Sequence, residues 1–182
     1  MLGVCEKFAR EYDVTYNSSK SLVLLLNERN VNLMKPIVKL NGEPIEYCDV
    51  ALHVGTFIGN GSNKANIQKA RRDLLIRYNS IASTFRRCSS DVLSTLFRSY
   101  CMSFYGSPLW MISEEKLKDL IIGWKRGIKT IFGLHMRTRS KYIPLIVSQP
   151  DLITQLMHRF MKFWLKCLNS ANEVVSMCAM LS

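Results

Sequence analysis

The spacing of apolar residues changes once along this chain, near residues 59–63, and that change constrains the fold more than any other feature. Before it, apolar residues form short runs that glycine, proline and asparagine interrupt, as in strands and turns. After it, they recur every three or four residues, which is the spacing of a buried helix face. The sequence therefore predicts an α+β protein in which a small antiparallel β piece precedes a helical bundle.

The first part predicts a short helix, then a buried strand, and then a β region of three strands. Apolar spacing favours a helix that ends near residue 12, and the run of Leu and Val at 22–26 predicts a buried strand. Asn41-Gly42 separates two strand-like runs, and both residues tolerate the positive φ of a tight hairpin turn. Residues 52–59, LHVGTFIG, predict a third strand in which Gly55 allows a bulge.

The second part predicts four helices, each with one apolar face. These faces comprise Ile67, Ala70, Leu74, Tyr78, Ile81 and Phe85; Leu93, Leu96, Phe97, Tyr100, Cys101 and Phe104; Leu117, Leu120, Trp124, Ile128 and Ile131; and Leu152, Leu156, Met157, Phe160, Phe163 and Trp164. Ser89 and Ser90 are expected to cap the second helix, and Gly106 and Pro108 to end it. We place domain boundaries at 1–60, 61–141 and 142–182.

The positive charge is concentrated in the middle of the chain. The net charge is +11, and residues 61–141 carry sixteen Lys and Arg against five Asp and Glu. Residues 1–60 carry six basic and seven acidic residues. A field confined to one segment attracts polyanions, of which nucleic acid is the usual one, although a basic surface can also serve solubility alone.

Several function classes lack their sequence signatures. No two aspartates are adjacent, the six cysteines show no CxxC spacing, and no metal or hydrolase motif occurs. The apolar runs are far shorter than the roughly 18 residues that cross a membrane, and the N-terminus lacks the core of a signal peptide. We therefore expect no membrane partner and an intracellular protein, in the nucleus or the cytoplasm.

Three stretches together resemble the reverse transcriptases of non-LTR, LINE-type retrotransposons. They are EYDVTYNSSKS, LNGEPIEYCDVALHVGTFIG and ARRDLLIRYNSIASTFRRCSSDVLSTLFRSYCMSFYGSPLW. The resemblance runs from about residue 8 to residue 110, and more weakly beyond. It implies a partial polymerase palm with a primer-grip hairpin at 1–60 and a thumb at 61–141. Residues 142–182 would complete the thumb or connect it to another domain.

The resemblance also implies roles for single residues. Lys20 matches the lysine that helps pyrophosphate leave, as a general acid or charge partner. The primer grip, which holds the 3′ end of the growing strand, would comprise Val54, Gly55, Thr56, Phe57 and Gly59, with Val54, Phe57 and Ile58 supporting it from the core. The candidates for contacts to the RNA/DNA template–primer duplex are Lys64, Lys69, Arg71, Arg72, Arg86 and Arg87.

The metal-binding aspartates of such enzymes precede the part that this chain resembles. We therefore expect a fragment of an RNA-directed DNA polymerase, without its own metal or cofactor, although the complete enzyme uses Mg²⁺. By itself the chain is expected not to polymerise DNA, and its exposed palm strand edge is expected to promote self-association. Two alternatives remain open: a non-catalytic basic nucleic-acid-binding module, and a helical interaction protein with acidic partners.

Overall fold

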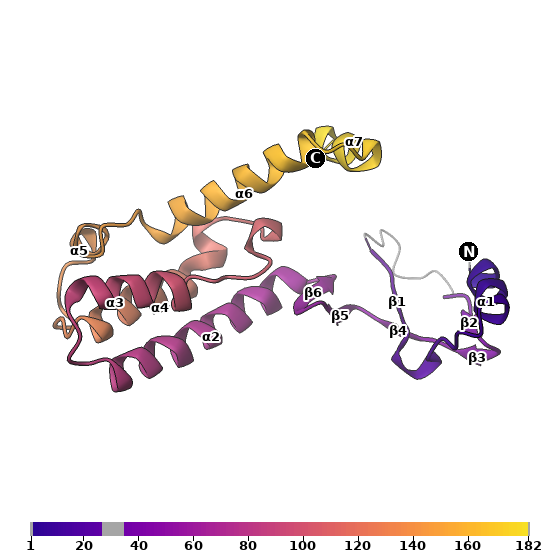
Figure 1. The fold of residues 1–182 in the computed structure, drawn as a ribbon, viewed down its shortest axis with the longest axis horizontal. Helices are drawn as coiled ribbons and strands as arrows, with labels where there is room; N and C mark the ends of the chain where they lie inside the picture. The colour runs from indigo at the N-terminus through magenta and orange to yellow at the C-terminus, as the bar shows by residue number, and fades with distance from the viewer. Residues whose placement is uncertain (1, 27–34, 182) are drawn as a thin grey trace. The chain divides into compact units, whose positions relative to one another are not determined.

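A computed structural model describes residues 2–26 and 35–181 of the chain. It contains both helices and strands and divides into two compact units, Met1–Ser62 and Asn63–Ser182 (Figure 1). The boundary lies two residues beyond the one placed at residue 60. Residues 142–182 share the second unit with residues 63–141.

The first unit holds one α-helix, a 3₁₀ turn and short strands. Its elements are α1 (Leu2–Glu11), η1 (Ser18–Lys20), β1 (Leu22–Leu24), β2 (Lys39–Leu40), β3 (Glu43–Pro44), β4 (Glu46–Cys48), β5 (Val50–His53) and β6 (Thr56–Gly59). The strands form three pairs, β1–β4, β2–β3 and β5–β6. The expected helix at the N-terminus is confirmed, although Val4, Phe8 and Tyr12 on it and beside it are exposed.

The hairpin predicted at Asn41-Gly42 is confirmed. Leu40 pairs with Glu43, so the loop has two residues, and their φ angles are 53° and 81°. Positive φ at both positions is the geometry of a type I′ turn, whose twist matches that of the flanking strands. The Asn41 side chain also donates to the Tyr16 carbonyl oxygen at 3.0 Å, which fastens the turn to the chain after α1.

Two expectations about the β region are wrong. β1 pairs with β4 in parallel, because the chain from Leu25 to Ile45 is long enough for the crossover that a parallel pair requires. The β piece is therefore not wholly antiparallel. β1 is also not buried, since Leu22 is 49% exposed and Leu26, just beyond the strand, is 66% exposed.

The second unit is helical. Its elements are α2 (Ser62–Thr84, whose first residue belongs to the other unit), α3 (Ser90–Leu96), the π-helical turn η2 (Phe97–Cys101), the 3₁₀ turn η3 (Ser107–Leu109), α4 (Glu114–Ile131), η4 (Ser140–Tyr142), α5 (Ile143–Ile146), α6 (Leu152–Leu168) and α7 (Glu173–Met180). The predicted second helix is thus shorter than expected, because its α-helical hydrogen bonds widen into a π turn at Phe97.

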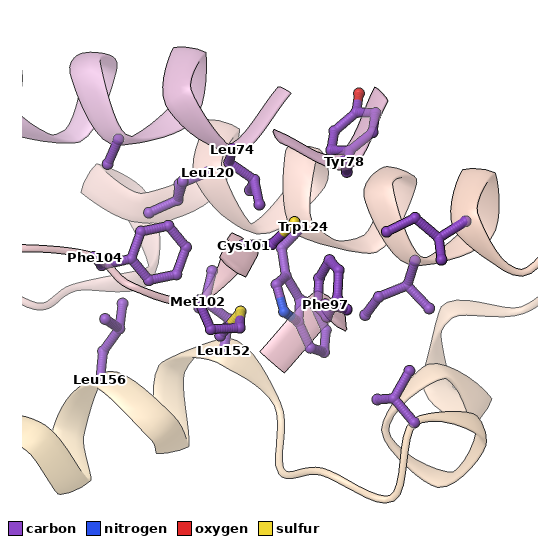
Figure 2. Close-up of a cluster of buried hydrophobic side chains, with 14 of the residues drawn as sticks. Leu74, Tyr78, Phe97, Cys101, Met102, Phe104, Leu120, Trp124, Leu152 and Leu156 are labelled. Carbon is purple, nitrogen blue, oxygen red and sulfur yellow. The ribbon is translucent and has the colours of Figure 1, made fainter. Parts of the chain in front are cut away.

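The core of this unit is one cluster contributed by α2, α3, η2, α4, α5 and α6. Phe97, Trp124 and Leu152 are almost fully buried, and Figure 2 shows them around Cys101 and Met102. The apolar faces predicted for α2 and α4 are confirmed, except that Phe85 follows the end of α2 and is exposed. In α6 only Leu152 and Leu156 are buried, while Met157 and Phe163 are exposed.

Candidate nucleic-acid interface

The predicted primer-grip residues form a tight hairpin in the first unit. β5 and β6 pair from Val50–Gly59 to His53–Thr56, and Val54-Gly55 is the two-residue turn between them. Residues 52–59 are therefore the end of one strand, a turn and a second strand. The apolar pattern predicted a single strand with a bulge, whereas the resemblance implied a hairpin in this segment. The φ angles of Val54 and Gly55 are 46° and 78°, so this turn has the same type I′ geometry as Asn41-Gly42.

The residues of this hairpin differ in exposure. Thr56 is buried and Phe57 is half-buried, whereas Val54 is 70% exposed and Ile58 is 39% exposed. The expectation that Val54 and Ile58 support the hairpin from the core is therefore wrong. Val54 lies in the turn, outside the paired strands, and Ile58 shares a face of β6 with Thr56 but is more exposed than Thr56.

Gly59 is the position in the hairpin where a side chain cannot fit. Its φ is +115°, and a Cβ built there would overlap the carbonyl oxygen of Asp49. The Asn60 amide nitrogen donates to that same oxygen at 2.8 Å. Glycine is thus required by the close approach of the protein's own backbone, which explains Gly59 without any ligand.

Lys20 lies at the other end of β1 from the base of this hairpin. It ends η1, whose first turn is held by the Asn17 side chain accepting from the Lys20 amide at 3.1 Å. The Asn60 side chain donates to the carbonyl oxygen of Leu25, beyond the last residue of β1, at 3.2 Å. The structure therefore places Lys20 before the strand and the hairpin base after it. The Lys20 side chain is exposed and forms no ion pair with any described residue.

The predicted phosphate contacts occupy α2 and the connection that follows it, in the second unit. Lys64 and Arg72 are exposed on the helix, and Arg86 and Arg87 are exposed just after it. Within residues 2–26 and 35–181 none of these four forms an ion pair. An anion from solution can therefore bind these four side chains without breaking an ion pair within the described residues.

The remaining two candidates are paired with acids. Lys69 Nζ lies 3.3 Å from Asp73 Oδ2 one turn along α2, and Arg71 Nη1 lies 3.9 Å from Asp119 Oδ2 of α4. Exposed ion pairs of this kind contribute about 0–1 kcal/mol, so a phosphate can displace either carboxylate. These two residues are weaker candidates than their unpaired neighbours.

Two other arginines are structural, although the sequence does not distinguish them from the exposed ones. Arg159 of α6 donates to the Met102 carbonyl oxygen at 2.5 Å, and its partial burial lowers the pKa of the guanidinium from its usual value. Arg77 donates to the Tyr100 carbonyl oxygen at 3.2 Å and lies over the Tyr100 ring. Both tie helices together, so they are unsuited to phosphate contacts.

An apolar groove is a feature that sequence analysis did not anticipate. It has a volume of about 860 Å³ and lies between η3 and the α6–α7 pair, where Leu109, Trp110, Phe160, Phe163 and Trp164 line it. None of its lining residues is charged. The sequence showed the apolar face of α6, but only the structure shows that Met157 and Phe163 on it are exposed.

No group of three or more His, Cys, Asp or Glu residues that could hold a metal ion occurs among the described residues. Of the helices described, none combines the length and the apolar character needed to cross a membrane. A scan of protein-family models found no match to the chain, and searches of curated proteins and of solved structures found none either. Any function must therefore be argued from these side chains and their surroundings.

Proposed function

We propose that the helical unit binds the sugar-phosphate backbone of an RNA/DNA template–primer duplex, as the thumb of a non-LTR retrotransposon reverse transcriptase. The first unit would then contain the end of the palm, with the β5–β6 hairpin as primer grip. The observation that carries the proposal is the set of exposed, unpaired cations on α2 and after it, Lys64, Arg72, Arg86 and Arg87.

The chemistry of these side chains favours contact with phosphates over contact with bases. They are long, exposed cations, and each can pair with a phosphate oxygen in any sequence. A polymerase thumb needs this kind of contact, because it must hold every duplex that the enzyme makes. Binding that depends on phosphates releases counterions, so its affinity falls steeply as salt rises.

The first unit is compatible with the palm assignment at the residue level. Lys20 presents an exposed ammonium just before β1, and such a group stabilises the negative charge of a leaving pyrophosphate. The β5–β6 hairpin exposes its turn at Val54, where a primer strand could contact it. The chain would contribute positioning, and the complete enzyme would supply the metal-binding aspartates.

Fluorescence anisotropy with a labelled RNA–DNA hybrid, measured across a salt series, tests the proposal. The variant Lys64→Gln/Arg72→Gln removes two unpaired charges from α2. It should flatten the slope of log affinity against log salt by about 2, since each phosphate contact contributes about 0.9. Lys162→Gln/Lys166→Gln removes the same charge from α6 and should leave the slope unchanged. Equal slopes for wild type and the α2 variant would overturn the proposal.

A second candidate, a helical interaction module, is favoured by the apolar groove beside α6 and α7. Tryptophan and phenylalanine side chains in a groove of that size are typical of surfaces that bind other proteins. The two readings differ in competition experiments. If the unit is a thumb, unlabelled hybrid competes with the labelled hybrid better than heparin does. If the unit is an interaction module whose basic faces bind acidic partners, the two polyanions compete equally.

A further inference from the structure

The loop between α4 and η4 is a second concentration of unpaired positive charge. Residues 133–142, GLHMRTRSKY, contain three exposed cations, Arg137, Arg139 and Lys141, and no acidic residue. None of the three forms an ion pair within the described parts of the chain. Lys141 Nζ lies 5.0 Å from the centre of the Tyr142 ring. This contact does not neutralise the lysine charge, because the ring carries no net charge.

The loop is held in one conformation by its own hydrogen bonds. The Leu134 amide donates to the Lys129 carbonyl oxygen at 2.8 Å, and the Thr138 amide donates to the His135 carbonyl oxygen at 2.9 Å. The Arg137 amide donates to His135 Nδ1 at 3.1 Å. A loop ordered in this way loses little conformational entropy when it binds a ligand.

A buried lysine fixes the centre of the loop. Lys129 of α4 is only 8% exposed, and its Nζ donates to the Met136 carbonyl oxygen at 2.7 Å. This bond joins the end of α4 to the residue directly before Arg137. The ammonium also adds a positive charge beneath the loop, and no described carboxylate lies within ion-pair distance of it.

The α2–α3 connection brings two more exposed cations to the same end of the helical unit. Figure 1 draws this connection and the α4–η4 loop together at the end of the unit farthest from the start of α2. The connection, residues 85–89, contains Arg86 and Arg87 and no acidic residue. Both segments therefore contribute charge of one sign to one end of the bundle.

From this arrangement we infer that the α4–η4 loop is a phosphate-binding loop for nucleic acid, with Arg137 and Arg139 as its contact residues and Lys129 as its positioning residue. Together with Arg86 and Arg87, the loop forms a basic end surface. This surface contacts the sugar-phosphate backbone at a different place from Lys64 and Arg72. The inference rests on the proposed function and extends it, because it adds a basic loop whose residues are not among the contacts predicted from the sequence.

The test uses the full chain and the same labelled hybrid. Arg137→Gln/Arg139→Gln changes two exposed side chains and should leave the circular dichroism spectrum and melting temperature unchanged. It should weaken binding by roughly tenfold or more near 0.1 M salt and flatten the salt slope by about 2. Lys162→Gln/Lys166→Gln, with the same change in net charge, should match wild type.

Each outcome decides between the two claims. If Lys64→Gln/Arg72→Gln weakens binding while the loop variant behaves like the α6 control, the loop is not a contact surface and the proposed function stands. If the loop variant weakens binding of heparin and of the hybrid equally, its partner is not specifically nucleic acid and the inference fails. Absence of any hybrid binding by the wild-type chain at low salt would overturn the proposed function and the loop with it.

Discussion

At the scale of single residues, Gly127 is where α4 leaves room for α2. A Cβ at this position would lie 2.6 Å from Tyr78 Cδ1, and Tyr78 is 2% exposed. Tyr78 cannot move aside without disturbing the core that Figure 2 shows. Gly127→Ala should therefore destabilise the helical unit by about 1–3 kcal/mol.

Gly123, one turn earlier on α4, is the matched control. A Cβ there would meet Arg71 Cγ at 3.9 Å, which is an ordinary contact. Gly123→Ala should stabilise the unit by up to about 1 kcal/mol, because alanine favours helix more than glycine does. Urea unfolding followed by tryptophan fluorescence measures both, since Trp110, Trp124 and Trp164 all lie in the helical unit. Equal effects of the two substitutions would contradict the contact with Tyr78.

Cys101 makes the stability of the same unit depend on pH. Burial raises the pKa of its thiol from 9.0 to about 12, and the nearby Arg77 charge lowers it only in part. Between these values the unfolded chain loses the proton while the folded chain keeps it. Stability should therefore fall as pH rises from about 9 towards 12.

The contribution of Cys101 is separated from other titrating groups by substitution. Cys101→Ala should show a shallower decline in urea midpoint over this pH range than wild type, whatever its loss at neutral pH. Cys88→Ala, at an exposed cysteine, should decline in parallel with wild type. A Cys101→Ala curve parallel to wild type would show that the thiol does not titrate differently in the two states.

At the scale of secondary-structure elements, the β5–β6 hairpin contains an unfavourable turn residue. Val54 has φ 46°, which a β-branched side chain adopts only with strain, and it is 70% exposed. Val54→Asn should relieve about 1 kcal/mol or more, because asparagine tolerates this conformation and would create the Asn-Gly pair that type I′ turns prefer. Val54→Thr keeps the branch and should bring no gain. Slower amide exchange across β5 and β6 in the asparagine variant alone is the expected result.

The two hairpins show how far local sequence could predict the β region. The dipeptide Asn41-Gly42 predicts a type I′ turn by itself, because both residues accept positive φ. Val54-Gly55 has only its glycine as a signal, and valine there favours a continuous strand. The local pattern therefore predicted one strand, and only the resemblance implied a hairpin. The parallel pairing of β1 with β4 depends on the path of the intervening chain, which no local pattern encodes.

In the helices, too, local sequence predicts one property and tertiary contacts decide another: apolar spacing shows which face can be buried, and packing decides how much of it is. The faces of α2 and α4 could be predicted because each is covered along the helix, so the predicted apolar positions within the two helices are all buried and only Phe85, beyond the end of α2, is exposed. In α6 the same spacing continues past Leu156 to Phe163, where the core no longer covers it. Periodicity identifies an apolar face but not how much of it finds a partner.

The candidate interface was likewise predictable only in part, because the sequence shows where cations occur but not which of them are paired in the folded chain. The sequence placed the excess of positive charge in residues 61–141, and the structure shows Lys64, Arg72, Arg86 and Arg87 exposed there. It could not separate them from Lys69 and Arg71, which meet carboxylates in the folded chain, one of them from α4. The basic loop after α4 was not among the predicted contacts, because its order depends on the buried Lys129, whose partner is the Met136 carbonyl oxygen.

At the scale of the whole molecule, β1 lies at the edge of a sheet that the described residues of the first unit form. β1 hydrogen-bonds to β4 along one edge, and no other described strand hydrogen-bonds to it. Leu22 at its start is 49% exposed. An apolar strand with a free edge pairs with another copy, so the chain should associate as its concentration rises through the micromolar range.

Sedimentation velocity on a charge-matched pair of variants tests this expectation. Leu22→Lys places a charge on β1 and should shift the population towards monomer, because a lysine at an edge strand opposes pairing between chains. Ile37→Lys adds the same charge at a residue that is 78% exposed and lies outside the strands, and it should associate like wild type. If both variants become monomeric, net charge rather than the β1 edge controls association. A wild-type chain that stays monomeric at every concentration would show that β1 does not act as an open edge.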